Sequence, residues 1–348
     1  MMPKLWIVPI EPLEERYSTQ WLRLFEQGFY FLGENLEFVF GEPITSKIEV
    51  GEFLDVFGTN YYKASQIMEL IKKIRSGLIS DEDIILFLDG WFPGIESLFY
   101  IKNGADRKFK IYSCLHAGTW DPHDFLSRKE MTPWARGIEL GWLRGMDGIF
   151  VATNFHKKLI TDTFSDFDHD KIHVTGFPLS FLEIELKAWS DKKNIVVFPH
   201  RNAPEKRPLN FDFLETSLKE KFPCWTFIKT AKHYTKPQYY KILSEAKIAV
   251  SCALQETWGI AQQEALFSGC LPLVPNSLSY VEMYSNIFRY ENEADALEKL
   301  ERMMSSCDNL SGHLADLLNS RNDDMNALRE RSNNSIKNMC NIFGFLRW

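Results

Sequence analysis

One stretch constrains the fold of this chain more than any other: residues 256–264, ETWGIAQQE, together with the segments on either side. An apolar, β-rich run precedes it at 248–252, and a second apolar run follows it at 271–274. Thr257 can cap the helix that is expected between these runs. Strand, loop, helix and strand in this order form a βαβ unit. Ligands of open parallel sheets bind outside the carboxyl ends of the strands, so the loop around Glu256 is a candidate site.

Two glutamates stand eight positions apart in this stretch. Glu256 lies in the loop and Glu264 about two turns into the predicted helix, so the pair could hold two polyols of one ligand. The N-terminus of the helix offers unpaired N–H groups to an anion between those polyols. The bare spacing is also common on solvated helix faces. The frame of strand, loop, helix, glycine stop and strand is what favours a ligand site.

This frame resembles the E-x7-E signature of retaining, nucleotide-sugar-dependent glycosyltransferases with the GT-B fold, especially family 4. The resemblance implies an α/β chain with two Rossmann-like domains facing a central cleft. It implies that Glu256 binds the hydroxyls of the donor sugar and that Glu264 binds the donor ribose. The backbone of the intervening turn would bind the donor at four residues: Trp258, Gly259, Ile260 and Ala261.

A basic loop, HRNAPEKRP, follows the apolar run 194–199. Arg201 and Lys206 would stand at the carboxyl tip of that strand, where cations neutralise a diphosphate and the charge that grows on it during bond cleavage. A solvated basic loop is the alternative. Family 4 carries an arginine and a lysine here that bind the donor diphosphate. Arg201, Lys206 and Glu256 are therefore predicted catalytic residues.

The first half of the chain offers a histidine cluster in HAGTWDPHDF, directly after the apolar run 110–115. The family commonly places a histidine near this point against the donor sugar. His116 is therefore the predicted catalytic residue of this half, with Asp121 and His123 behind it as acceptor-side candidates. A structural histidine is an equally good interpretation of the residues alone.

The loop at 11–18 follows the first apolar run, where GT-B folds often have a Gly-rich loop. Polar residues replace the glycines, and Arg16 is a candidate acceptor contact. An ordinary helix entry capped by Ser18 is the alternative. Asp89-Gly90-Trp91 follows the run 84–88 and favours a turn that closes the strand.

Neither a metal nor a cofactor is expected, apart from a nucleotide-sugar as donor substrate. The acidic triplet 81–83 precedes its strand, whereas the metal-binding DxD motif of other glycosyltransferases follows one, so we interpret it as a solvated loop. The six cysteines form no CxxC pair and no zinc spacing, which is typical of reduced thiols.

Length and charge narrow the class further. A chain of 348 residues favours two domains, and a net charge of -7 argues mildly against an obligate nucleic-acid binder. No apolar run reaches membrane-spanning length and no signal-peptide layout appears, which predicts a cytoplasmic protein without stable membrane insertion. We expect an acceptor-side domain at 1–188, a nucleotide-sugar-binding domain at 189–325, and a helix and tail at 326–348 that cross back.

The sequence predicts a retaining hexosyl- or pentosyltransferase that acts on a hydroxyl acceptor. The segments around 198–208 and 251–275 look closest to relatives that glycosylate a modified nucleoside in tRNA, and DNA-modifying enzymes also use this fold, so a modified base in DNA or tRNA is the expected acceptor. A lipid or polysaccharide acceptor is the rival. A non-catalytic nucleotide-sugar-binding module and a sugar-nucleotide epimerase remain open. A dehydrogenase is disfavoured because no G-x-G-x-x-G follows a predicted strand.

Overall fold

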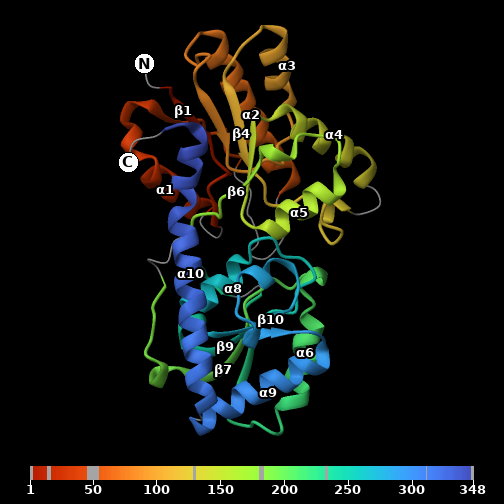
Figure 1. Cartoon of the computed structure of the whole chain (residues 1–348), viewed down its shortest axis with the longest axis vertical. Coiled ribbons are helices and arrows are strands. Elements are labelled where there is room, and N and C mark those ends of the chain that lie inside the picture. The colour runs from red at the N-terminus through yellow and green to blue at the C-terminus, as the bar shows by residue number, and fades with distance from the viewer. Residues whose placement is uncertain are drawn as a thin grey trace. The chain divides into compact units, whose positions relative to one another are not determined.

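The computed structural model describes residues 3–13, 17–44, 55–127, 131–179, 184–231, 234–310 and 312–345. These residues form two compact units (Figure 1). The first unit contains the described residues from 3 to 179 and from 331 to 345, and the second contains those from 184 to 330. No helix among the described residues is long and apolar enough to span a membrane.

The first unit is built on a six-stranded parallel sheet in the order β2-β1-β3-β4-β5-β6. The chain leaves β1 toward β2 on one side and returns to β3 on the other, so the strand order reverses between β1 and β3. The strands are β1 (Leu5–Val8), β2 (Leu36–Phe38), β3 (Ile84–Phe87), β4 (Lys110–Cys114), β5 (Gly148–Val151) and β6 (Ile172–Val174).

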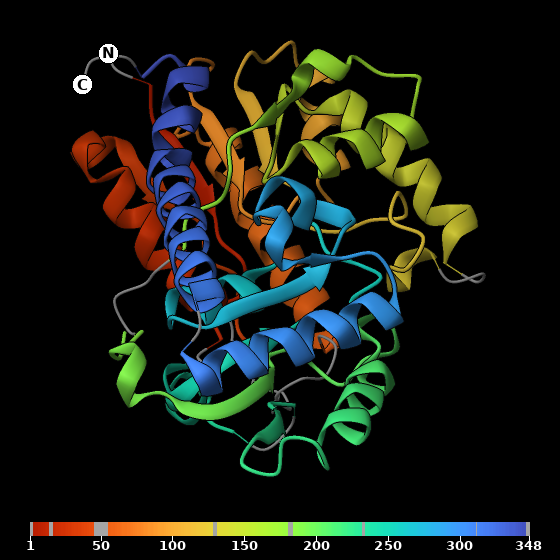
Figure 2. The same ribbon diagram turned by 60° about the horizontal axis from the view of Figure 1, so that its bottom comes forward.

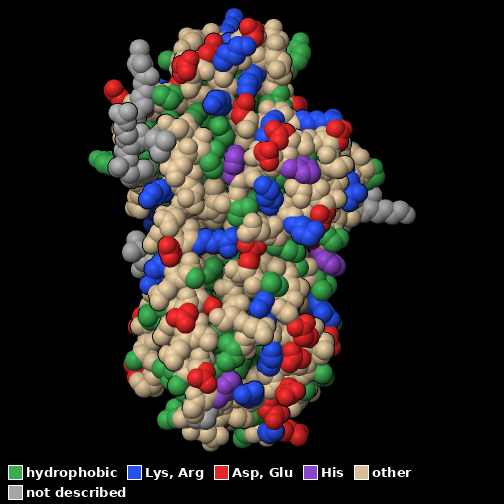
Figure 3. Space-filling view, in the orientation of Figure 1, with side chains coloured by type: hydrophobic (Ala, Val, Ile, Leu, Met, Phe, Trp, Pro, Cys, Tyr) green, Lys and Arg blue, Asp and Glu red, His purple; other side chains and the backbone are tan. Residues whose placement is uncertain are grey.

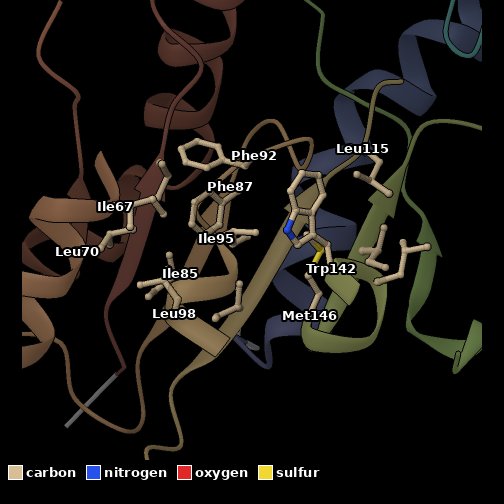
Figure 4. Packing of buried hydrophobic residues seen from close by; sticks show 14 of the residues in the cluster. Ile67, Leu70, Ile85, Phe87, Phe92, Ile95, Leu98, Leu115, Trp142 and Met146 are labelled. Carbon is tan, nitrogen blue, oxygen red and sulfur yellow. The ribbon is translucent and has the colours of Figure 1, made fainter. Parts of the chain in front are cut away.

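Helices cover both faces of this sheet because its strands are apolar on both sides. Alternate residues such as Ile85 and Phe87 point toward α2, α3, α4 and α5, where they meet Ile67, Leu98 and Trp142 (Figure 4). The helices are α1 (Tyr17–Gly28), α2 (Val56–Arg75), α3 (Glu96–Gly104), α4 (Thr132–Gly145) and α5 (Asn154–Thr163).

An aromatic layer includes the C-terminal part of the last helix, α10 (Gly312–Phe343), which belongs to the first unit from Arg331 onward. The ring of Phe343 lies 4.9 Å from that of Tyr112 and 5.5 Å from that of Phe150, measured between centroids. Phe29 of the α1 side also contacts Phe343 at 6.1 Å. Edge-to-face pairs of this kind add to the apolar burial that holds α10 to the unit.

The second unit contains a five-stranded parallel sheet in the order β11-β10-β9-β7-β8. The strand order reverses between β7 and β9, so the loops after these two strands flank the switch point of the sheet. The strands are β7 (Lys193–Phe198), β8 (Thr226–Lys229), β9 (Ala246–Val250), β10 (Leu271–Pro275) and β11 (Arg289–Tyr290).

The period-two pattern of β7 explains how helices are shared between the two faces of this sheet. Val196 and Phe198 pack with α6, α9 and the first turns of α10, whereas Ile195 and Val197 pack with α7 and α8 (Figures 1 and 2). The helices are α6 (Pro208–Leu218), α7 (Lys236–Glu245), α8 (Ile260–Phe267) and α9 (Glu293–Asn309).

Short 3-10 segments complete the described structure: η1 (Tyr30–Asn35), η2 (Phe125–Ser127), η3 (His169–Lys171), η4 (Trp189–Asp191), η5 (Pro204–Lys206), η6 (Leu278–Glu282) and η7 (Asn286–Phe288). Two parallel α/β units confirm the fold class expected from the sequence. The division between the units lies after Leu179, where the sequence analysis set it at 188.

Candidate functional site

The loops after β7 and β9 carry the polar residues of the second unit's switch point. A backbone bond joins the loops, because the N–H of Leu254 donates to the carbonyl of Glu205 at 2.8 Å. Ligands of open parallel sheets bind in the crevice outside the strands at such a point. The structure therefore brings the predicted basic loop and the predicted glutamate loop together.

Lys206 and Glu256 form an ion pair at this position, with Nζ of the lysine 3.2 Å from Oε2 of the glutamate. Lys206 also donates to the carbonyl of Gln255 at 2.5 Å and is only 8% exposed. Burial opposes the charge on Glu256, but nearby Lys206 and a backbone N–H bond outweigh it and lower the pKa of that carboxyl. The glutamate is thus held ionised beside a fixed ammonium.

The carboxylate of Glu256 also organises the start of α8. Its Oε1 accepts the N–H of Gly259 at 2.8 Å, and Gly259 is the N-cap residue with φ of 63°. The expected cap at Thr257 is wrong: α8 begins at Ile260, no side chain caps it in the usual way, and Glu256 binds the turn instead. Glycine is suited to this left-handed conformation because it has no Cβ.

The first turn of α8 leaves backbone N–H groups directed out of its N-terminal end, which favours an anion near Ile260 and Ala261. Trp258 is buried before this turn. A Cβ on Gly259 would lie 3.2 Å from Cε1 of Tyr280 and 3.5 Å from Cγ of Glu256, so the backbone here is closely surrounded. Of the predicted backbone contacts, all four residues therefore lie in one turn beside Glu256.

Arg201 is the exposed member of the basic loop. Its Nε lies 3.2 Å from Oε1 of Glu205, in an i,i+4 ion pair whose arginine side chain is 39% exposed. Surface pairs of this kind contribute little free energy, so the guanidinium can exchange Glu205 for a ligand phosphate at small cost.

Glu264 is buried in α8 and is bound by residues of α7. Lys236 donates to its Oε1 at 2.8 Å, Tyr240 to the same atom at 2.9 Å, and Tyr239 to Oε2 at 2.9 Å. Burial, with Glu264 nearby, raises the pKa of the Tyr239 hydroxyl well above its usual value, so this hydroxyl stays a donor. Glu256 and Glu264 lie on the same helix entry but share no printed partner, and each has its own network.

His200 is a residue that the sequence analysis did not single out, at the end of β7. It is 3% exposed, and its Nε2 has no hydrogen-bond partner among the described residues. Burial, followed by the positive charge of Lys206, lowers the pKa of His200 to about 3. The ring is therefore neutral and adds no charge to the site.

The pH dependence of unfolding should report this buried histidine. A folded-state pKa below the unfolded value means that stability is complete above pH 6.5 and is lost as the pH falls toward the folded pKa of about 3. Between pH 6.5 and about pH 5 the loss should be about 2 kcal/mol. We expect His200→Gln to reduce this dependence in urea titrations; an unchanged slope would contradict a buried neutral ring.

In the first unit, His116 follows β4 and lies among aromatic rings. Its centroid is 4.8 Å from that of Trp21 and 5.8 Å from that of Tyr17, and its Nε2 lies 2.8 Å from the carbonyl oxygen of Leu88. Burial lowers the pKa of His116, which favours the neutral ring. The half-buried ring is thus fixed at the carboxyl edge of the sheet.

The other acceptor-side candidates do not form one cluster with His116 through any printed contact. Asp121 is buried, and its Oδ1 accepts the N–H of His123 at 2.9 Å, while the ring of His123 is exposed. Asp121 therefore shapes the turn that presents His123. Arg16 lies outside the described residues.

Two buried groups that the sequence analysis missed support the loop after His116. Glu139 of α4 accepts the indole N–H of Trp91 and the N–H of Thr119, both at 3.0 Å. His156 of α5 accepts the indole N–H of Trp120 at 3.0 Å. A glutamate and a histidine within helical patterns carry no local signal of this role, because their partners are distant in sequence.

A buried ion pair was also missed in the first unit. Nζ of Lys63 in α2 lies 2.8 Å from Oδ2 of Asp89 and donates to the carbonyl of Trp91 at 2.6 Å. The sequence analysis favoured a strand-closing turn for Asp89. The turn is present, since Oδ1 accepts the N–H of Trp91 at 3.2 Å, but the carboxylate also serves the lysine.

The basic residues that could have formed a rim for nucleic-acid phosphates are mostly paired with acids. Positive and negative side chains alternate on the face of the first unit seen in Figure 3. The pairs are Lys102 with Asp147, Arg107 with Asp81, Lys108 with Asp106, and Arg144 with Asp166. Such a surface carries mixed charge instead of a continuous basic stripe.

The described residues contain no group of three or more His, Cys, Asp or Glu side chains placed to hold a metal ion. The candidate site consists of an ionised glutamate, a buried ammonium, an exchangeable guanidinium and a helix N-terminus. Together these groups can bind a hydroxyl-bearing ligand that carries a diphosphate.

Solved structures share this fold. Sucrose-phosphate synthase from Thermosynechococcus elongatus matches 99% of this chain and 98% of its own, with a TM-score of 0.68 and 9% identity. TarM from S. aureus, crystallised with fondaparinux, alpha-GlcNAc-glycerol and UDP, matches 80% of this chain with a TM-score of 0.57 and 15% identity. The aligned part is 58% of the TarM chain. The two parallel α/β units are those of the GT-B fold.

Sequence comparison finds a shorter likeness. The tRNA-queuosine alpha-mannosyltransferase of Drosophila melanogaster is 40% identical over 67 residues, which are 19% of this chain and 18% of the fly protein. No protein-family model matches the chain.

Proposed function

We propose that this chain is a glycosyltransferase that moves a sugar from a nucleotide-sugar donor to a hydroxyl acceptor. The observation that carries the proposal is the Lys206–Glu256 ion pair beside the N-terminus of α8, at the switch point of the second unit. A carboxylate suits sugar hydroxyls, and an ammonium and a helix N-terminus suit phosphates. The GT-B fold of the matched structures supports the same assignment.

The donor would be divided among the groups of this site. Lys206 and Arg201 bind the diphosphate, with Arg201 exchanging Glu205 for a phosphate oxygen. Glu256 binds the transferred sugar, and the N–H groups at the start of α8 bind the phosphate next to it. Glu264 binds the ribose through the acceptor capacity that its three present donors leave, since a carboxylate offers about four lone-pair sites.

The proposed reaction retains the anomeric configuration and passes through a front-face route. The leaving diphosphate takes the proton of the incoming hydroxyl, while the fixed charge of Lys206 and the α8 N-terminus stabilises the negative charge that develops. Neither step needs a metal ion. His116 remains the candidate catalytic residue of the first unit.

For the acceptor we propose a modified base, with tRNA ahead of DNA. The 67-residue likeness to a tRNA-queuosine mannosyltransferase supports this choice. The mixed charge of the first unit's surface offers no continuous basic stripe, so recognition of the modified nucleoside itself must supply much of the binding. A lipid or polysaccharide acceptor is the competing proposal.

The experiment that tests this function offers the protein a panel of nucleotide sugars together with total tRNA or hydroxymethylated DNA. Mass spectrometry of the digested nucleosides should reveal one nucleoside heavier by a sugar residue, and NMR should show that the product has the anomeric configuration of the donor. Transfer with inversion would overturn the retaining mechanism. Transfer to a lipid or glycan alone would overturn the nucleoside acceptor.

Glu264→Ala should affect binding more than chemistry. The ribose is remote from the reacting carbon, so loss of its carboxylate contact removes binding in the ground and transition states alike. We expect the donor KM to rise about tenfold, equivalent to one charge-assisted hydrogen bond, with kcat within about threefold of wild type. Steady-state kinetics would check this, and a kcat loss without a KM change would contradict the assignment.

A further inference from the structure

The first unit contains a cavity of about 60 Å³ at the carboxyl ends of β1 and β3. These are the strands between which the order of this sheet reverses, so the cavity lies at the switch point where open parallel sheets bind ligands. Its polar lining comes from the loop after β1, the α2 helix and the end of β3: Glu11, Ser18, Thr59, Lys63, Gln66 and Asp89.

Two buried polar atoms of the lining residues lack a partner among the described residues: Oγ1 of Thr59 and Oε1 of Gln66. The orientation of Gln66 is well determined, because its Nε2 donates to the carbonyls of Pro9 and Val39 at 3.0 and 2.9 Å. A flipped amide would set its oxygen against two carbonyl oxygens. Leaving such groups unpaired costs free energy, so they require a partner that can enter the cavity.

The chemistry of the lining selects the kind of partner. The oxygen of Gln66 only accepts, and the carboxylate of Asp89 only accepts when ionised, so a ligand must bring O–H or N–H donors. The ammonium of Lys63 is already bound by Asp89 and by the carbonyl of Trp91, which leaves little positive charge for an anion. Apolar contact comes from Phe92 and Leu13. A neutral polyol satisfies all of these conditions.

The volume agrees with a small group. A single water requires roughly 15 Å³ of such space, so the cavity admits several hydroxyl groups but not a whole oligosaccharide. The cavity also adjoins His116, because Tyr17 lines it and its ring lies 5.8 Å from that of His116.

We infer that this cavity is a binding subsite for a neutral, vicinal diol or similar polyol group, held by Thr59, Gln66 and the Lys63–Asp89 pair. As an acceptor subsite it rests on the proposed glycosyltransferase function, and it gives that function a substrate class: an acceptor that presents a hydroxyl-bearing ring or short polyol. Thr59 and Gln66 are specificity-determining residues here, and the Lys63–Asp89 pair fixes the end of β3 beside them.

The test measures polyol binding by the full chain without a nucleotide sugar. Saturation-transfer NMR with glycerol and myo-inositol should show both probes bound by the wild type, and inorganic phosphate should not displace them. Thr59→Val removes only a hydroxyl that makes no printed bond, so the fold should be retained while affinity for the polyols falls about fivefold to tenfold. Asp89→Asn, a second variant of equal size, should weaken binding at least as much.

Two control variants separate this inference from the proposed function. Thr161→Val changes a hydroxyl on α5 that is bound to its own helix, and it should leave polyol binding unchanged. Glu256→Gln alters the second unit and should also leave it unchanged. No polyol contact in the wild type, or equal affinity in wild type and Thr59→Val, would overturn the subsite even if donor turnover is normal. Polyol binding without any use of a nucleotide sugar would overturn the proposed function alone.

Discussion

Replacing Lys206 with alanine is expected to lower turnover more than about a hundredfold, because the leaving diphosphate loses a preorganised positive charge. Lys206 is 8% exposed and fixed by Glu256 and the Gln255 carbonyl, so no other cation can move into its place without rearrangement. The measurement is kcat at saturating donor for the purified variant. Arg201→Ala is expected to lose a similar factor.

Loss of folding must be separated from loss of chemistry in this experiment. Removing Lys206 leaves Glu256 without its counter-ion, which should lower the free energy of unfolding by about 1–3 kcal/mol, and urea titration measures that. Lys193→Ala is the matched control: its Nζ pairs with Glu245 at 2.8 Å on the surface, and turnover should stay near wild type. Near-normal turnover of a folded Lys206→Ala protein would refute the diphosphate role.

The second large effect is expected at Glu256. Glu256→Ala removes the proposed sugar contact and the acceptor for the Gly259 N–H, and we expect turnover to fall about a hundredfold, as for loss of one preorganised group. Glu256→Gln keeps an oxygen for Gly259 but loses the charge, so its loss should be smaller, about tenfold.

The order of the two variants is the informative result. If Glu256 only caps the turn before α8, glutamine should restore full turnover because its amide oxygen can accept the same N–H. Equal turnover of Glu256→Gln and wild type would therefore reduce the residue to a structural role. Single-turnover kinetics with one donor would distinguish the two cases.

The positions of the second unit's site could be predicted because local pattern determines them. An apolar run followed by polar residues gives a strand and the loop at its carboxyl end, and the order of the units in a parallel sheet brings such loops together. This is why Lys206 and Glu256 meet across 50 residues of sequence. The start of α8 was predicted less well, because glycine in a left-handed conformation replaces a side-chain cap at Thr257.

Contacts that depend on tertiary packing could not be predicted. Lys63 reaches Asp89 from a helix whose polar pattern does not distinguish a buried lysine from a solvated one. Lys192 donates to the carbonyls of Ser244, Ala246 and Ser268, which joins the ends of α7 and α8, although its sequence surroundings are those of a surface loop. Likewise, the three donors on Glu264 come from α7 and have no signature within the E-x7-E spacing.

The central claim is that the Lys206–Glu256 site binds a nucleotide sugar, and one measurement tests it most directly. The purified protein is incubated with a broad panel of nucleotide sugars, and the melting temperature and nucleotide release are followed for wild type and Lys206→Ala. We predict that one donor stabilises the wild type and is slowly hydrolysed, and that Lys206→Ala loses both effects. Absence of stabilisation by every donor in the panel, or equal stabilisation of the variant, would contradict the account.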